Sequence, residues 1–145
     1  MKEMLELAEQ AVEAARFWNI ELDYSAESLE PLEKMMQAVF RSHKNVPLPV
    51  DMLFNVANMY GAYLGEVLLR SGLEDLGFAW MTNDEGEAGI GRKDMKIWPV
   101  TKVYKRITQG PEHDLMNFFE VMFGLAIGAV DLADPRMHVL NQKAV

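Results

Sequence analysis

Apolar residues recur with the spacing of a helix along most of this chain, and this spacing predicts five helices. Three helices come first, over residues 2 to about 18, 28 to about 45, and about 50 to 70. After a stretch with a different pattern, a short helix begins at Pro99, and a last helix runs from about residue 114 to 132. The chain is therefore expected to be mostly helical.

Single residues mark the ends of these helices. Trp18 is the last member of the apolar stripe of the first predicted helix. Ser28 precedes the second helix, and we expect its hydroxyl to accept hydrogen bonds from the free amides of the first turn. Gly72 follows the third helix and predicts its end, because glycine readily adopts the left-handed conformation found there.

The third helix is apolar on two faces, which predicts burial on both sides and a central place in the fold. It also contains Gly61 and Gly65, one turn apart. Each glycine costs about 1 kcal/mol relative to alanine inside a helix, so a packing reason is expected. We predict that another element approaches the helix closely at these two positions.

Between the third and fourth helices the pattern changes to short apolar runs separated by turn residues. Three strands are predicted there, over residues 77–82, 88–91 and 95–98, and the short turns between them indicate an antiparallel meander. Together with the helices, this pattern predicts an α+β fold. Four to five helices are expected to pack around a small three-stranded sheet.

Length and composition are those of an ordinary globular protein. The chain has 145 residues, half of them apolar and a quarter charged. We predict one domain over residues 1–134, followed by a loosely ordered tail over residues 135–145. The sequence shows neither the pattern of a signal peptide nor a run of about 18 apolar residues, so we expect a cytoplasmic protein with no membrane contact.

The net charge of −8 disfavours binding to nucleic acid, whose phosphates would be repelled. Between residues 92 and 106, however, six basic residues and one aspartate give a local charge of +5, which leaves −13 for the rest of the chain. We expect the basic residues of the short helix to balance the protein's own glutamates. The alternative is a site for an anion or for an acidic partner. The residues concerned are Lys102, Lys105 and Arg106.

The sequence contains no established catalytic pattern, neither a phosphate-binding glycine loop nor a nucleophile elbow. It has no cysteine, which excludes disulfides and thiolate-bound metals. His43, His113 and His138 stand far apart in the chain, so no metal site is expected. No cofactor is expected either, and the sequence favours a protein without enzymatic activity.

Glu66 lies among apolar residues on the predicted central helix, one turn from Tyr63 and from Arg70. We expect it to be at least partly buried, with Arg70 or a lysine of the 102–106 segment as its partner. Such an ion pair would be structural. The alternative is a ligand-facing carboxylate in a pocket near Tyr63, Glu66 and Trp98, to which the basic residues of the short helix contribute.

The last helix is apolar nearly all round, over about four turns. A domain of this size can hardly enclose both this helix and the third one, so we predict a two-fold dimer through the last helix. Enclosure of the helix between the sheet and the first two helices is the alternative. The expected interface residues are Phe119, Phe123, Gly124, Ile127 and Gly128.

Several short motifs resemble those of a class of small bacterial proteins known only as domains of unknown function. The motifs are a G-x-Y-x-G-E helix at residues 61–66, a strand with Trp80, and Trp98-Pro99 followed by Val103-Tyr104-Lys105-Arg106. The resemblance covers residues 28 to 121. It implies a bacterial origin and an α+β fold, and it implies no activity.

We therefore expect a non-enzymatic interaction protein, for instance of regulatory or immunity type, whose acidic surface favours a basic protein partner. The alternative is a small-molecule or anion-binding protein, or an enzyme, that uses the pocket near Glu66. A flat acidic face would favour the first function, and a deep apolar pocket with a perturbed carboxylate would favour the second. The candidate binding residues are Tyr63, Glu66, Arg70, Trp98, Lys102, Lys105 and Arg106.

Overall fold

The computed structural model describes residues 2–93 and 95–133. Within these ranges the chain forms five α-helices and one three-stranded antiparallel sheet, so the predicted α+β fold is confirmed. The tail predicted at residues 135–145 lies outside the described residues. The helices are α1 (Lys2–Arg16), α2 (Leu29–Asn45), α3 (Val50–Leu68), α4 (Pro99–Gln109) and α5 (Leu115–Ala133). The strands are β1 (Ala79–Thr82), β2 (Ala88–Arg92) and β3 (Met95–Ile97).

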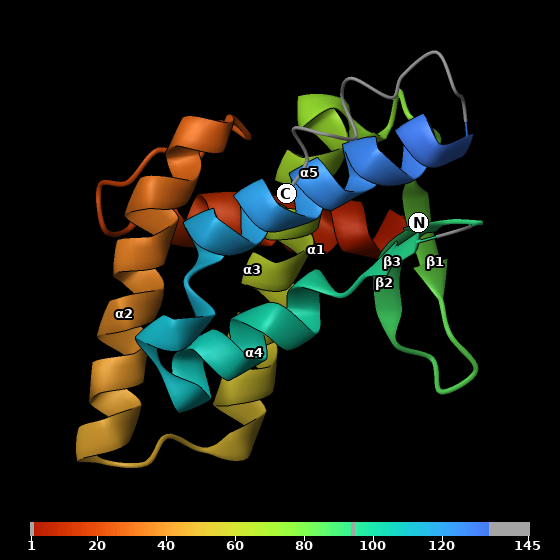
Figure 1. Cartoon of the computed structure of the whole chain (residues 1–145). Coiled ribbons are helices and arrows are strands. Elements are labelled where there is room, and N and C mark those ends of the chain that lie inside the picture. The colour runs from red at the N-terminus through yellow and green to blue at the C-terminus, as the bar shows by residue number, and fades with distance from the viewer. Residues whose placement is uncertain (1, 94, 134–145) are drawn as a thin grey trace.

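Helix α3 is the centre of the fold, as its two apolar faces predict. It passes between α1 and α4, and every residue from Tyr60 to Leu68 is buried (Figure 1). The chain then continues through a wider helical turn, Leu69–Leu73, in which Gly72 has a φ of 147°. Because this φ favours glycine, the predicted end of the helix lies where the sequence indicates it.

The two glycines of α3 are explained by their neighbours. A Cβ on Gly61 would lie 2.4 Å from Cα of Val100 on α4, and a Cβ on Gly65 would lie 2.2 Å from the indole of Trp80 on β1. Both distances are far shorter than a van der Waals contact, so a larger residue would push these elements apart. The predicted close approach is confirmed at both positions, and it brings α4 and the sheet directly onto α3.

The sheet has the order β1-β2-β3, the predicted meander, and lies at one end of the helical part of the molecule (Figure 1). Trp80 pairs with Ile90, which in turn pairs with Ile97. These three residues share the face that packs against α3 and the core around Leu68. Because side chains alternate along a strand, Gly89 and its neighbours on the other face point away from α3.

The end of α1 differs from the prediction. The helix stops at Arg16, and Trp18 is 74% exposed instead of completing the apolar stripe. Asn19 adopts a left-handed φ of 58°, and the Ile20 N–H donates to the Ala15 carbonyl, which ends the helix two residues earlier than predicted. The indole therefore lies on the surface beyond the helix.

The start of α2 also differs from the prediction. Ser28 occupies the N-cap position, but its side chain makes no capping hydrogen bond. A short 3-10 turn, Ala26–Ser28, precedes α2, and Ser25 caps this turn by accepting from the Ser28 N–H at 3.2 Å. The Ser28 hydroxyl instead lies 2.6 Å from the Tyr63 hydroxyl on α3. The same hydroxyl donates to the Ser25 carbonyl at 2.6 Å, so the Ser28 side chain makes one local and one tertiary hydrogen bond instead of a cap.

Helix α5 contacts α2, α4 and β3, and it follows a second 3-10 turn, Pro111–His113. Phe118 and Phe119 pack against the cores on both sides of α3. None of the described helices is long and apolar enough to cross a lipid bilayer. One side of α5 faces the sheet and α4.

Candidate functional site

The single pocket predicted near Tyr63, Glu66 and Trp98 is not formed, because the candidate residues lie in three separate places. Tyr63 and Glu66 are on α3, and Arg70 is in the turn Leu69–Leu73 that follows it; Arg106 is enclosed between helices; Trp98, Lys102 and Lys105 line a surface pocket. The reason lies in the sheet. Glu66 binds Trp80, which faces α3, whereas Trp98 packs against Gly89 on the opposite face.

Glu66 is 5% exposed, and both oxygens of its carboxylate accept hydrogen bonds. Arg70 Nε donates to Oε1 at 3.0 Å, and Trp80 Nε1 donates to Oε2 at 2.7 Å. The predicted burial and the predicted pair with Arg70 are confirmed. The hydrogen bond from Trp80 was not predicted, although a tryptophan on an inner strand face needs an acceptor for its N–H. Because Trp80 is on β1, the Glu66 carboxylate links β1 to α3 by a hydrogen bond.

Tyr63 is fully buried and joins α3 to the segment that precedes α2. Its hydroxyl accepts from the Tyr24 N–H at 2.8 Å and shares a hydrogen bond with Ser28. Burial raises the pKa of this hydroxyl above its usual value. The ring stacks on Tyr24, whose other neighbour is the Arg70 guanidinium at 3.7 Å from the Tyr24 ring centre. Tyr63 presents no surface to a ligand and has a structural role.

Arg106 is 1% exposed and forms a buried ion pair with Glu33 of α2. Its Nη2 lies 2.6 Å from Glu33 Oε2, and its Nε donates to the same carboxylate at 2.9 Å. Gln37 accepts a further hydrogen bond from Nη2, whereas Nη1 has no partner among the described residues. The prediction that the basic helix balances the protein's own glutamates is therefore confirmed for Arg106.

Glu33 was not predicted to be a partner of Arg106, although its position in the sequence indicates that it is paired. Glu33 lies next to Leu32 and three residues before Met36, on the apolar stripe of α2. A carboxylate in such a position is buried only when it is paired. Its Oε1 also accepts from the Leu115 N–H at 3.1 Å, so Glu33 caps the start of α5 as well.

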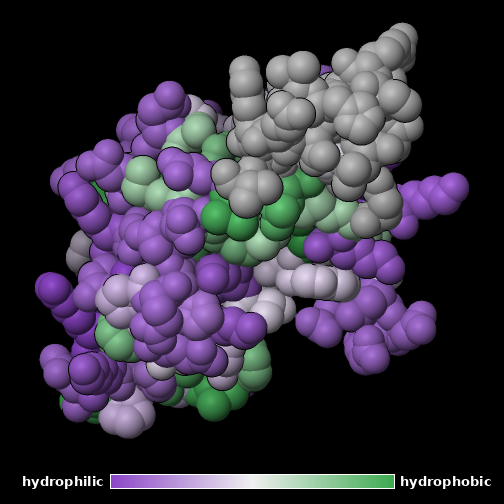
Figure 2. Space-filling view, in the orientation of Figure 1, coloured by the Kyte–Doolittle hydropathy of each residue, from purple (hydrophilic) through white to green (hydrophobic). Residues whose placement is uncertain are grey.

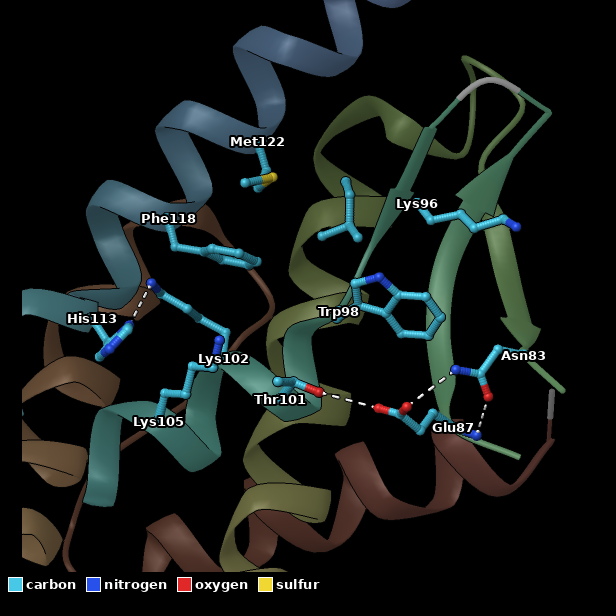
Figure 3. Close-up of a pocket in the computed structure, with 11 residues that line it drawn as sticks. Asn83, Glu87, Lys96, Trp98, Thr101, Lys102, Lys105, His113, Phe118 and Met122 are labelled. Carbon is cyan, nitrogen blue, oxygen red and sulfur yellow. Dashed lines mark hydrogen bonds between the residues drawn. The ribbon is translucent and has the colours of Figure 1, made fainter. Parts of the chain in front are cut away.

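A pocket of about 580 Å³ lies where α4, α5 and the outer face of the sheet meet (Figure 3). Trp98 lies across its middle, and Phe118 and Met122 project into it from α5. We call it the basic pocket, because three lysines line it. Its lining residues are Asn83, Glu87, Lys96, Ile97, Trp98, Thr101, Lys102, Lys105, His113, Phe118 and Met122.

Lys102 is the best fixed cation of the basic pocket. His113 Nε2 lies 2.8 Å from Gln109 Oε1 and donates to it, so Nδ1 is left to accept from Lys102 Nζ at 3.1 Å. Burial, followed by the charge of Lys105, lowers the pKa of Lys102; burial and the charge of Lys102 lower the pKa of His113. The pocket therefore holds ammonium groups beside a neutral imidazole.

Lys102 and Lys105 do not balance the protein's own glutamates, which corrects the expectation from their sequence. In the part of the chain that the structure describes, no carboxylate lies within salt-bridge distance of either ammonium group. The acidic group of the pocket, Glu87, lies at its other end, where Asn83 Nδ2 donates to Glu87 Oε1 at 3.1 Å. The pocket thus has a basic end and an acidic end, with Trp98 between them.

A second hollow, of about 600 Å³, opens between α2 and α3 and is lined almost entirely by apolar side chains. We call it the methionine groove. The predicted burial of α3 on both sides is wrong at this end of the helix, where Met52 is 47% exposed. The lining residues are Trp18, Ile20, Lys34, Met35, Met36, Ala38, Val39, Ser42, Leu48, Met52, Val56, Met59 and Tyr60.

The predicted dimer residues on α5 lie mostly toward the core. Phe119 and Phe123 stack at 5.5 Å between ring centres and pack inward, and Gly128 is buried. Over residues 115–128, where the burial of the side chains is described, the exposed large apolar side chains of the helix are instead Met116, Val121 and Leu125. Figure 2 shows the resulting hydrophobic surface along α5, on a face that is otherwise largely hydrophilic.

The described residues contain no group of three or more histidine and carboxylate side chains that could hold a metal ion. Comparison of the chain with protein-family models, with curated proteins and with solved structures finds no match. The family resemblance drawn from the motifs therefore stays a prediction.

Proposed function

We propose that this protein is a cytoplasmic, non-enzymatic interaction protein of regulatory or immunity type, which binds an amphipathic helix of a basic protein partner. The observation that carries the proposal is the methionine groove. This hollow of about 600 Å³ has an almost wholly apolar lining, and contiguous apolar surfaces mark sites of interaction.

The groove has the arrangement of side chains that a helix requires. Met35, Val39 and Ser42 follow one another at i, i+4 and i+7 on α2, and Met52, Val56 and Met59 do so on α3. Both rows line the methionine groove. A helix laid between them would present its own apolar residues at the same spacing, as in other helix-in-groove complexes.

The kinds of side chain in the groove also favour a protein ligand. Methionine is flexible and polarizable, so its side chain adapts to the irregular apolar face of a partner helix. Trp18, exposed at the edge of the groove, is of the residue type that most often dominates binding energy in protein interfaces. An indole so exposed on a free protein would become buried on binding.

The charge of the protein favours a basic partner. The net charge is −8, and the positive residues between 92 and 106 leave −13 for the remainder of the chain, which includes the whole groove. Such a field accelerates association with a positively charged protein. The likeness of the motifs to small bacterial proteins is the basis for a bacterial origin and for the regulatory or immunity type.

A synthetic helix tests the proposal. We would titrate the protein with a tryptophan-free peptide of about 18 leucines and lysines, arranged with one apolar face, and follow the tryptophan fluorescence. Binding is expected, and Met52→Lys or Met59→Lys should weaken it about tenfold or more because a charge then enters the groove.

Met116→Lys is the matched control, because Met116 is a similarly exposed methionine on α5, outside the groove. The control should bind as the wild type does. If Met116→Lys weakened peptide binding as much as Met52→Lys does, the assignment of the binding site to the methionine groove would be wrong. If a leucine–glutamate peptide bound as tightly as the leucine–lysine peptide, the preference for a basic partner would be wrong. Circular dichroism shows whether each variant is folded.

A further inference from the structure

We infer that the basic pocket is a binding site for a small organic anion: one acidic group held by Lys102 and Lys105, and an apolar or aromatic body held on Trp98. This site is separate from the methionine groove, with which it shares no lining residue. The inference therefore stands independently of the proposed protein partner.

The two lysines at the basic end of the pocket favour the binding of an anion. Lys102 and Lys105 are three residues apart on one side of α4, so their positive charges lie close together and oppose each other. The protein has 22 acidic residues against 14 lysines and arginines, yet among the described residues no carboxylate lies within salt-bridge distance of these two ammonium groups, and Asp114 acts on Lys102 only from a greater distance. An acidic group between them would replace repulsion by charge-assisted hydrogen bonds.

The geometry of Lys102 is suited to this role. Its Nζ is held by His113 and lies 5.4 Å from the ring centre of Phe118, so the ammonium group is placed before a ligand arrives. The partner that holds it is neutral, because Nδ1 of His113 acts as an acceptor. Lys102 therefore keeps its positive charge available for an anion.

The middle of the pocket is built for an apolar body. Gly89 allows the Trp98 indole to lie directly on β2, since a Cβ there would be 2.7 Å from the ring. Phe118 and Met122 face the indole from α5 (Figure 3). The Trp98 N–H forms no hydrogen bond with any described residue, so it can donate to an oxygen of the ligand.

At the far end of the pocket, Glu87 disfavours a second acidic group of the ligand beside it. Glu87 is held there by Asn83, whose Oδ1 accepts from the Glu87 N–H at 2.8 Å. A second acidic group at this end would be repelled, whereas a hydroxyl or amine could donate to the Glu87 carboxylate. The volume of about 580 Å³ is that of a site for a small organic molecule.

Isothermal titration calorimetry with three probes measures separately what the acidic group and the apolar body of a ligand contribute to binding. The first is 2-naphthoate, which has an aromatic body and one carboxylate; the second is the neutral 2-naphthalenemethanol; the third is inorganic phosphate. We expect 2-naphthoate to bind at least about tenfold more tightly than either of the others, because only it engages both the lysines and Trp98.

Variants then locate the site. Lys102→Gln and Lys105→Gln should each weaken 2-naphthoate binding about tenfold, and so should Trp98→Leu if its thermal melting shows that it is folded. Lys34→Gln is the control, because Lys34 lines the methionine groove, and it should leave the affinity unchanged.

The inference is overturned if 2-naphthoate does not bind, or if the neutral alcohol binds as tightly as the carboxylate. If inorganic phosphate bound as tightly as 2-naphthoate, the inference that an apolar body of the ligand packs on Trp98 would be wrong. An effect of Lys34→Gln as large as that of Lys102→Gln would place the probe elsewhere and would overturn the assignment to the basic pocket.

Discussion

Glu33 on α2 and Arg106 on α4 form an ion pair with 2.6 Å between Oε2 and Nη2, although 73 residues separate them in the sequence. The same carboxylate accepts the N–H of Leu115, the first residue of α5. One acidic side chain therefore joins three helices. Since a buried charge is costly without its partner, this pair makes the packing of the helices depend on both residues.

Glu33→Ala is expected to lower the free energy of unfolding by about 3–5 kcal/mol, because Arg106 would stay buried without its counter-charge. Urea denaturation measures the loss. Glu30→Ala is the matched control on the same helix: Glu30 forms an exposed pair with Lys34 at 3.6 Å, and its removal should cost less than about 1 kcal/mol. Equal losses in the two variants would show that the buried pair is not important for stability.

Glu66→Ala is expected to lower the free energy of unfolding by about 1–3 kcal/mol, because the Trp80 N–H and Arg70 lose their acceptor. Glu66→Gln should cost less, since the amide oxygen still accepts from Trp80. The exposed Glu74 provides the control, Glu74→Ala. If Glu66→Gln proved as harmful as Glu66→Ala, the charge rather than the hydrogen bond to Trp80 would dominate.

His113 should make stability depend on pH. Burial and then the Lys102 charge lower its pKa in the folded protein below the ordinary 6.5, while Glu112 opposes this effect. The unfolded chain then binds a proton more readily, so the contribution of His113 is present above pH 6.5 and is lost as the pH falls through the lowered pKa of the folded state. Wild type should lose more stability than His113→Asn between about pH 7.5 and about pH 5. Parallel losses in urea denaturation would contradict this.

The predicted dimer can now be tested at the exposed side of α5. Sedimentation at micromolar concentration should show a species larger than the 16.5 kDa monomer, and Leu125→Glu should split it because Leu125 is 44% exposed. Phe119→Glu is less informative, since Phe119 packs into the core and the variant is expected to unfold. A monomeric wild type would disprove the dimer.

The sequence was sufficient for features that depend on residues near one another in the chain. The spacing of apolar residues predicted the five helices and the meander, because secondary structure has a fixed period. Gly61 and Gly65 predicted a close approach, since glycine in a helix is otherwise unfavourable. Glu66 and Arg70 were paired correctly because residues four apart are neighbours on any helix.

The tertiary structure alone decided how these elements combine into sites. Glu33 meets Arg106 only because α2 and α4 pack together, and Ser28 shares a hydrogen bond with Tyr63 only because α3 lies beside the turn that precedes α2. Trp98 is separated from Glu66 by the sheet, since a strand directs alternate residues to opposite faces and a shift of one residue reverses them. Local patterns fix the period of each element, but the contacts between elements depend on how they pack, which no short stretch of sequence contains.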